Sequence, residues 1–262
     1  MSDAAVRVSG EAPVPGELVS LTGDAAGVRT LTLNDHARRN AISAEMEPQL
    51  GAAVAAVAAD AGARVLIVAG AGSAFCAGAD LAATFGGADE PLAELRRRLL
   101  RLYDSFLAIA RLEIPTIAAV QGAAVGAGVN LALACDLRIA GPQARFGITF
   151  SRLGLHPGGG ASWFLTRAVG RQRALSLLLD GATVDAPAAL GLGLVLDLVD
   201  DPLAEARARA ARWAALDLEL LRNVKRTVRL AELGTLEDTV DAESWAQAAS
   251  ARSGDPARFR KS

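Results

Sequence analysis

Residues 122–136 read GAAVGAGVNLALACD, and this stretch decides the class of fold that we expect. An apolar, strand-like run (residues 116–121, TIAAVQ) precedes it, and an apolar, helix-like run follows its glycines. A glycine-rich turn from a strand into a helix exposes backbone N–H groups at the helix N-terminus, where the partial positive charge favours anions. The stretch therefore predicts a buried strand–turn–helix unit with an anion-binding end, and Asn130 places an amide beside that end.

The rest of the chain repeats short strands and helices. Residues 17–33 alternate apolar and polar residues on both sides of GDAAG, which predicts a hairpin. Ser43 is a suitable N-cap for a helix over residues 44–59. Further strands are expected at residues 63–70, 116–122, 136–141 and 193–200, with helices over residues 89–112 and over most of the chain after residue 162. This alternation predicts an α/β fold.

The composition divides the chain into three regions. Residues 1–16 read as a flexible N-terminal tail, residues 17–200 as the core, and residues 201–262 as a helical C-terminal region. The amphipathic pattern of the last region suits packing across the core or against a neighbouring subunit.

Charge and cysteine content exclude several classes of protein. The net charge of −2 gives no general attraction to nucleic acid or to an anionic membrane. Residues 116–135 are uncharged, but their glycines, Gln121 and Asn130 favour a buried unit over a membrane span. Cys76 and Cys135 lie in apolar runs and form no metal-binding pattern, so we expect free thiols, a reducing compartment and a cytoplasmic protein.

Two segments join a strand end, glycines and a helix start: residues 68–81 and residues 120–133. Neither fits a nucleotide site, because the first lacks the third glycine of G-x-G-x-x-G and the chain contains no G-K-[ST]. The second resembles the short-chain dehydrogenase turn, but no lysine follows a tyrosine at the required spacing. We therefore favour an oxyanion hole that takes one N–H from each loop.

Four segments resemble the successive signatures of the enoyl-CoA hydratase/isomerase (crotonase) superfamily. They are LNDHARRNAISAEM (33–46), AGSAFCAGADL (71–81), VQGAAVGAGVNLALACDLRIA (120–140) and FGITFSRLGLHPGGGASWFLTRAVG (146–170). The resemblance extends from about residue 17 to residue 258. It implies a crotonase-type spiral of ββα repeats that forms two sheets, followed by a helical region that mediates trimerisation. A homotrimer or a dimer of trimers is the expected assembly.

The resemblance also implies the substrate and the polarising groups. The backbone N–H groups of Ala79 and Ala127 would hold the thioester oxygen of an acyl-CoA. Coenzyme A would then be part of the substrate, and no separate cofactor or metal is expected.

Residues for coenzyme A follow from the same resemblance. Those that it places near the adenine and phosphate groups are Arg38, Arg39, Ala41, Ala77, Asp80 and Leu81, and Phe259 and Lys261 would contact coenzyme A from a neighbouring subunit. Two alternatives stay open: the arginines are solvated loop charges, and Asp80 only caps a helix.

The acids that hydratases of this family use are missing. The first glutamate position falls on Asn130, the second on Phe150, and a third acidic position used by other members falls on Gly158. An amide has no useful basicity, and each absent acid–base role costs about 10²–10⁴ in rate. Ordinary 2-enoyl-CoA hydration is therefore expected to be weak.

Two functions remain open. In the first, the protein is an enzyme that relies on enolate stabilisation, with His156 as a candidate proton-transfer group. In the second, it is a non-catalytic acyl-CoA-binding or carrier protein that has kept the pocket and lost the acids. His156 has its own alternative interpretation, as a turn residue hydrogen-bonded to the backbone.

Overall fold

Two β-sheets form the framework of the computed structural model, which describes residues 7–8, 16–86 and 90–253. The larger sheet has the order β1-β2-β3-β4-β6-β8-β11 and the smaller one the order β10-β9-β7-β5. The strands of the larger sheet are β1 (Arg7–Val8), β2 (Val19–Gly23), β3 (Val28–Leu33), β4 (Val65–Gly70), β6 (Thr116–Val120), β8 (Leu137–Ala140) and β11 (Asp197–Leu198). Those of the smaller sheet are β5 (Ala74–Cys76), β7 (Ala123–Val125), β9 (Arg145–Gly147) and β10 (Thr183–Asp185).

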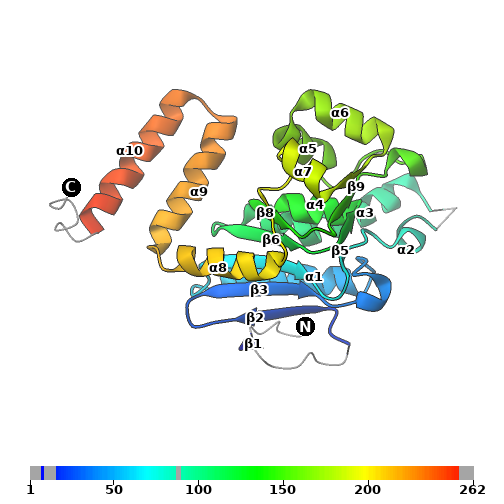
Figure 1. Cartoon of the computed structure of the whole chain (residues 1–262), viewed down its shortest axis with the longest axis horizontal. Helices are drawn as coiled ribbons and strands as arrows, with labels where there is room; N and C mark the ends of the chain where they lie inside the picture. The colour runs from blue at the N-terminus through cyan, green and yellow to red at the C-terminus, as the bar shows by residue number, and fades with distance from the viewer. Residues whose placement is uncertain (1–6, 9–15, 87–89, 254–262) are drawn as a thin grey trace.

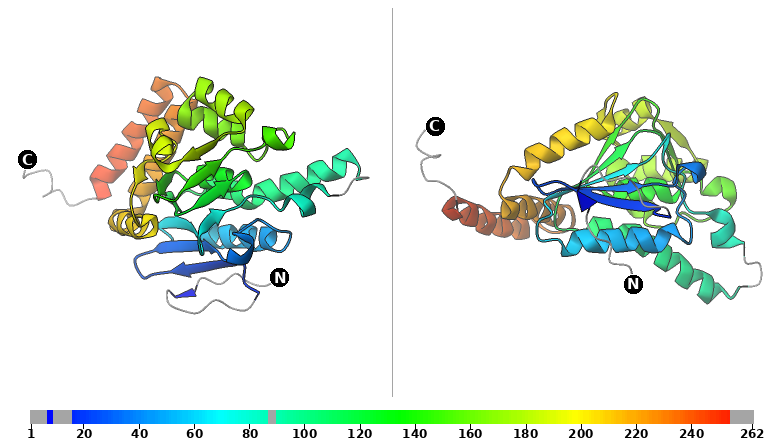
Figure 2. Two further views of the ribbon diagram at one scale, coloured as in Figure 1. Left: turned by 45° about the vertical axis from the view of Figure 1, so that its right-hand side comes forward. Right: turned by 90° about the horizontal axis from the view of Figure 1, so that it is seen from below.

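The larger sheet is buried on both faces along its parallel strands. β2 and β3 form the predicted antiparallel hairpin, whereas β3, β4, β6 and β8 run parallel to one another. Alternate side chains of β4 enter two cores: Leu66 and Val68 pack into the main core, and Val65 and Ile67 pack against α8 (Pro202–Ala214). Helix α8 covers one face of the sheet and α1 (Met46–Ala59) the other (Figure 2). Burial on both faces explains why these strands are continuous apolar runs.

Each central strand of the larger sheet continues into one strand of the smaller sheet. The chain runs from β4 to β5, from β6 to β7 and from β8 to β9 (Figure 1). In the smaller sheet, β7 pairs in parallel with both β5 and β9. After β7 the chain enters α4 (Ala127–Ala134), the helix predicted after the opening glycines. The α/β architecture with repeated ββα units is therefore confirmed.

The remaining helices surround this framework. They are α2 (Leu81–Phe85), α3 (Leu92–Leu107), α5 (Ala161–Val169), α6 (Arg171–Asp180), α7 (Ala186–Leu192), α9 (Leu218–Leu233) and α10 (Leu236–Ser253), with short 3₁₀ turns η1 (His36–Arg38), η2 (Ala108–Arg111) and η3 (Ser151–Leu153). Ser43 Oγ accepts a hydrogen bond from Met46 N at 3.2 Å, as expected of a cap, although regular helix begins only at Met46. Helices α9 and α10 form a hairpin to one side of the sheets (Figure 1).

Two details of the predicted elements were wrong. Residues 183–185 form strand β10 against β9, within a region predicted to be helical. Their side chains alternate exposed, buried, exposed, and three residues between two helices give too short a pattern to recognise. In the segment 193–200 only Asp197 and Leu198 pair as a strand.

The uncharged residues 116–135 lie inside the fold, as β6, β7 and α4, with Thr116, Val120 and Asn130 all buried. Among the described residues, no helix combines the length and the apolar character that crossing a membrane requires.

The two glycine-rich loops lie in direct backbone contact. A Cβ placed on Gly122 would lie 1.9 Å from Ser73 O, and one on Gly128 would lie 2.2 Å from Cys76 O. On the opposite loop, a Cβ on Gly78 would lie 2.5 Å from Val125 O. Glycine at these positions is thus required by a neighbouring main chain, which no side chain can displace.

Substitution Gly122→Ala tests this contact. Its methyl group would collide with the Ser73 carbonyl, so we expect the free energy of unfolding to fall by about 3 kcal/mol or more, as for severe overpacking. The control is Gly191→Ala in α7, where a Cβ meets nothing within 4 Å. The free energy of unfolding of this control should stay unchanged or rise by up to about 1 kcal/mol, because alanine has a higher helix propensity than glycine. Urea unfolding of both variants gives the comparison, and equal stabilities would contradict the contact.

Candidate active site

The N-terminus of α4 presents a backbone N–H group without a backbone partner. Gly126 precedes the helix with φ 51°, and its carbonyl accepts from the N–H groups of Val129 and Asn130 at 3.0 and 3.2 Å. The Ala127 N–H donates to no backbone group in the part of the chain that the structure describes. Such N–H groups in the first turn of a helix are available for an anion or a carbonyl oxygen.

Ala79 offers a second such donor. It forms a parallel bridge with Ile42, in which Ile42 N donates to Gly78 O at 2.8 Å and Asp80 N donates to Ile42 O at 3.1 Å. This pattern leaves the Ala79 N–H pointing away from Ile42, and it has no backbone acceptor within the described ranges. A Cβ on Gly78 would lie 3.5 Å from Ala127 N, so the two donor segments are adjacent.

Two amide side chains hold the donor loops in place, and we did not recognise either from the sequence. Asn40 is fully buried and its Nδ2 lies 2.9 Å from the carbonyl oxygens of Ala71 and Ala74. Gln121 Nε2 donates to Gly70 O at 2.7 Å and to Ala74 O at 2.9 Å. The available signal for Gln121 was an amide directly before a glycine-rich loop, where carbonyl groups outside regular structure need donors. Asn40 lies 31 residues from Ala71 and leaves no local signal.

The three positions to which the sequence resemblance assigns acids lie around the start of α4. Asn130 is 1 % exposed, and its Nδ2 donates to Gly158 O at 2.8 Å. Its Oδ1 is buried with no hydrogen-bond partner. Phe150 packs partly buried, with Cε1 4.0 Å from where a Cβ of Gly126 would stand. The structure thus brings these three positions together with one donor segment.

Tyr103 of α3 also reaches this place. A Cβ on Gly158 would lie only 2.2 Å from Tyr103 Oη. Burial raises the pKa of the phenol, so the hydroxyl keeps its proton at neutral pH. No pattern in the sequence marked this contact, because Tyr103 lies in a helical repeat of leucines and reads as a packing residue.

His156 is exposed in the turn before α5, and its Nδ1 lies 2.8 Å from Pro157 O. A carbonyl oxygen only accepts, so Nδ1 carries the hydrogen in this contact. The contact is the one expected of a turn residue, and a catalytic role for His156 stays a prediction.

The loop predicted to meet coenzyme A lies beside the Ala79 segment. Ala77 N donates to Arg39 O at 2.9 Å, and Arg39 is exposed with a left-handed backbone. Arg38 pairs with Asp35 at 2.6 Å and with Glu45 at 3.7 Å, and the hydrogen bond to Asp35 raises its pKa. The guanidinium is thus already paired, yet half-exposed.

The other coenzyme A positions differ in exposure. Ala41 and Ala77 are half-buried, and Leu81 is exposed. Asp80 accepts from Ala83 N at 3.1 Å, which is the helix-cap geometry of its alternative interpretation. Phe259 and Lys261 lie outside the described residues.

Comparison with known proteins fits this geometry. Residues 23–253 match the family model described as enoyl-CoA hydratase/isomerase. The chain belongs to this family.

Individual relatives agree with this assignment. The chain is 52 % identical to the probable enoyl-CoA hydratase EchA14 of Mycobacterium tuberculosis over 77 % of its length and 78 % of that protein. It is 38 % identical to 1,2-epoxyphenylacetyl-CoA isomerase of Escherichia coli, over 87 % and 88 % of the two chains. A candidate enoyl-CoA hydratase from Thermobifida fusca, solved in complex with acetoacetyl-CoA, superposes with a TM-score of 0.81 at 31 % identity, covering 89 % of this chain and 94 % of that one.

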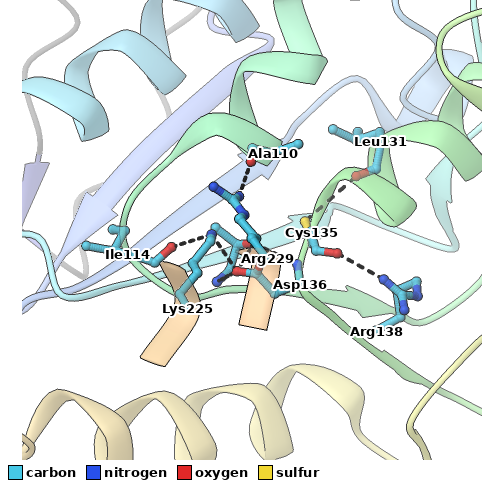
Figure 3. Close-up of polar contacts among 9 residues, drawn as sticks. Ala110, Ile114, Leu131, Cys135, Asp136, Arg138, Lys225 and Arg229 are labelled. Carbon is cyan, nitrogen blue, oxygen red and sulfur yellow. Dashed lines mark hydrogen bonds and ion pairs between the residues drawn. The ribbon is translucent and has the colours of Figure 1, made fainter. Parts of the chain in front are cut away.

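A cavity of about 960 Å³ lies elsewhere in this family member, between α5 and α9. Its lining includes Trp163, Val224 and Val228 but none of the donor or acid positions. At its edge Lys225 is buried with Nζ 2.6 Å from Asp136 Oδ2 and 2.7 Å from Ile114 O (Figure 3). Asp136 also accepts from the Thr116 N–H at 2.8 Å. This cluster anchors α9 to the end of α4.

Neither thiol is poised for chemistry. Cys76 and Cys135 are free and buried, and burial raises the pKa of each to about 12. A nucleophilic thiolate at neutral pH is therefore disfavoured. The described residues contain no group of three or more His, Cys, Asp or Glu that could hold a metal ion.

The ion pair of the buried Lys225 with the partly exposed Asp136 gives an asymmetric stability test. The Lys225 side chain is 6 % exposed and that of Asp136 is 30 % exposed. Asp136→Asn leaves a buried ammonium without a counter-charge and should cost about 3 kcal/mol. Lys225→Met removes the buried charge and leaves a carboxylate that still contacts solvent and the Thr116 N–H group. The free energy of unfolding should therefore fall clearly less than in Asp136→Asn. Urea unfolding measures both, and a larger loss for Lys225→Met would contradict this view of the pair.

Proposed function

We propose that this protein is an acyl-CoA-processing enzyme that polarises a thioester carbonyl between the N–H groups of Ala79 and Ala127. The observation that carries the proposal is the adjacency of these two backbone donors, neither of which has a backbone acceptor among the described residues. A developing enolate oxygen placed between them gains two hydrogen bonds in a preorganised site. The relative solved with acetoacetyl-CoA supports a thioester ligand at a related fold.

Ordinary hydration is not the reaction that this site favours. Water must be activated and a proton delivered to Cα, whereas Asn130, Phe150 and Gly158 stand where the acids would be. We propose enolate-dependent chemistry such as double-bond isomerisation, decarboxylation or thioester cleavage. The 38 % identical relative named as an isomerase supports the first of these.

A second candidate function is acyl-CoA binding without turnover. The absent acids favour it, together with the exposure of His156 and its contact with Pro157. Coenzyme A would lie along Arg38, Arg39, Ala41, Ala77, Asp80 and Leu81, with Phe259 and Lys261 added by a neighbouring subunit in a trimer or a dimer of trimers. We place the protein in the cytoplasm on its two buried free thiols.

A paired measurement separates the two candidates. Affinity for saturated and 2-enoyl-CoA thioesters is measured beside turnover of the same panel, followed by enone absorbance, released thiol and product analysis. We expect binding, slow hydration and measurable turnover by another route. Binding without any turnover supports the carrier function, and rapid hydration contradicts our assignment of the acid positions.

Ala127→Pro tests the oxyanion donor directly. Proline lacks the N–H group but is well tolerated in the first turn of a helix, and Ala127 is the first residue of α4. We expect a loss of about 10²–10³ in kcat. Ala127→Ser keeps the N–H group and is the matched control. Equal activities of the two variants, each shown to be folded by circular dichroism, would remove Ala127 from the mechanism.

The exposed apolar side chains of α9 and α10 support the proposed assembly. Val224, Val228, Leu233, Val240 and Trp245 are each more than half exposed in the single chain. Light scattering should give a mass three or six times that of the 26.9 kDa chain. Trp245→Glu should shift the mass toward the monomer, whereas Gln247→Glu on the same helix should not. A monomeric wild-type protein would contradict the assembly.

A further inference from the structure

The two proposed oxyanion donors are supported in different ways. The Ala127 N–H belongs to the first turn of α4, so the helix itself fixes its direction. Ala79 lies outside the two sheets, in an isolated bridge with Ile42. Three backbone hydrogen bonds of 2.8–3.1 Å join its segment, residues 77–80, to residues 39–42. The direction of the Ala79 N–H therefore depends on where residues 39–42 lie.

Regular structure does not hold residues 39–42 in place. Arg39 and Asn40 both have a left-handed backbone, with φ of 52° and 56°. They are the only non-glycine residues with positive φ in the part of the chain that the structure describes. This conformation is unfavourable for residues with a side chain, although less so for asparagine. Such a turn persists only where other contacts fix it.

The side-chain amide of Asn40 supplies those contacts. It is fully buried, and its Nδ2 lies within 3.2 Å of three carbonyl oxygens of the glycine-rich loop, those of Ala71, Ala74 and Phe75. Its Oδ1 accepts from Asp35 N at 2.9 Å, and the Asn40 N–H donates to Asp35 O at 2.7 Å. One amide thus joins the left-handed turn to the loop that leads to Ala79.

Asparagine meets three requirements at position 40. It tolerates the left-handed backbone, donates two hydrogens and accepts a hydrogen bond. An ionised aspartate has no hydrogen for the three carbonyl groups, and glycine keeps the backbone but loses the amide. Gln121 donates to the same loop but, among the described residues, not to residues 39–42. Of the two amides, only Asn40 joins the loop carbonyls to the segment that pairs with Ala79.

We propose that Asn40 is the positioning residue of the Ala79 donor. Its side chain is buried and acts through the backbone, by fixing residues 39–42. It thereby sets the direction of the Ala79 N–H, and with it the degree to which the thioester carbonyl is polarised. The Ala127 donor does not depend on it. This assignment rests on the proposed function, since it requires a thioester oxygen between Ala79 and Ala127.

The carbonyl carbon of a bound thioester reports this polarisation. The probe is butyryl-CoA with carbon-13 at C1, whose resonance moves downfield when hydrogen bonds draw electron density toward the oxygen. We expect a downfield shift on binding to the wild-type protein and at most about half of that shift in Asn40→Gly, because one of the two donors is then misdirected. The Kd of the probe should stay within about fivefold of wild type, because a hydrogen bond to a neutral carbonyl adds little net affinity.

Kinetics give the same separation between polarisation and binding. For a thioester that the wild-type protein turns over, kcat should fall about tenfold or more in Asn40→Gly while KM changes clearly less, because the lost interaction strengthens in the transition state. If Asn40→Gly does not fold, Asn40→Ser takes its place. Its hydroxyl group keeps one hydrogen for the loop carbonyls, so it should give an intermediate shift.

Val57→Ala is the control for stability. Val57 is a core residue of α1 with 2 % exposure, so its truncation lowers the free energy of unfolding, but the full carbonyl shift should remain. A full shift in folded Asn40 variants, or an equal loss of shift in Val57→Ala, would show that Asn40 does not position the donor, while the proposed function stands. If the probe does not bind the wild-type protein, or binds without a shift, the proposed function itself fails.

Discussion

The structure depends on the main-chain contact between two loops that leave the larger sheet at the ends of β4 and β6. Gly78, Gly122 and Gly128 allow one backbone to lie against the other at distances that exclude a Cβ. That contact aligns β5 with β7 and sets the start of α4 beside Ala79. Asn40 and Gln121 supply the donors that this irregular backbone lacks. Both proposed oxyanion donors belong to the backbone, so their geometry depends on this packing and not on the side chains at positions 79 and 127.

The same site combines a preserved framework with altered chemistry. The N–H groups of Ala79 and Ala127 have no backbone acceptor among the described residues, and the three positions to which the sequence resemblance assigns acids hold an amide, a phenyl ring and a glycine. In the proposed site the side chains at these three positions therefore carry no charge. A site of this kind can stabilise an enolate oxygen, but it has no strong base of its own at the acids' positions.

The sequence predicted the parts that repeat a pattern. The hairpin, the longer strands of the larger sheet and both glycine-rich loops followed from apolar runs, alternation and glycine spacing, and family membership followed from four linked segments. The three-residue strands β5, β7 and β9 were not predicted. The position of Tyr103 was not predicted, because the helical spacing of the leucines indicates which face of the helix is buried. It does not indicate which residue a hydroxyl group on that helix contacts. Strand β10 escaped because three residues cannot show a period. Contacts between residues distant in the chain, such as Asn40 with Ala74, leave no local pattern.

The ion pair of Lys225 and Asp136 gives α4 a second role. Ala127 begins this helix at the donor site, and Asp136 follows its last turn and holds Lys225 of α9. A helix of 8 residues is about 12 Å long and does not bend appreciably. It therefore connects the proposed thioester position rigidly to α9, the first helix of the C-terminal hairpin. The ion pair therefore couples the position of α9 to the loop contact that positions the start of α4.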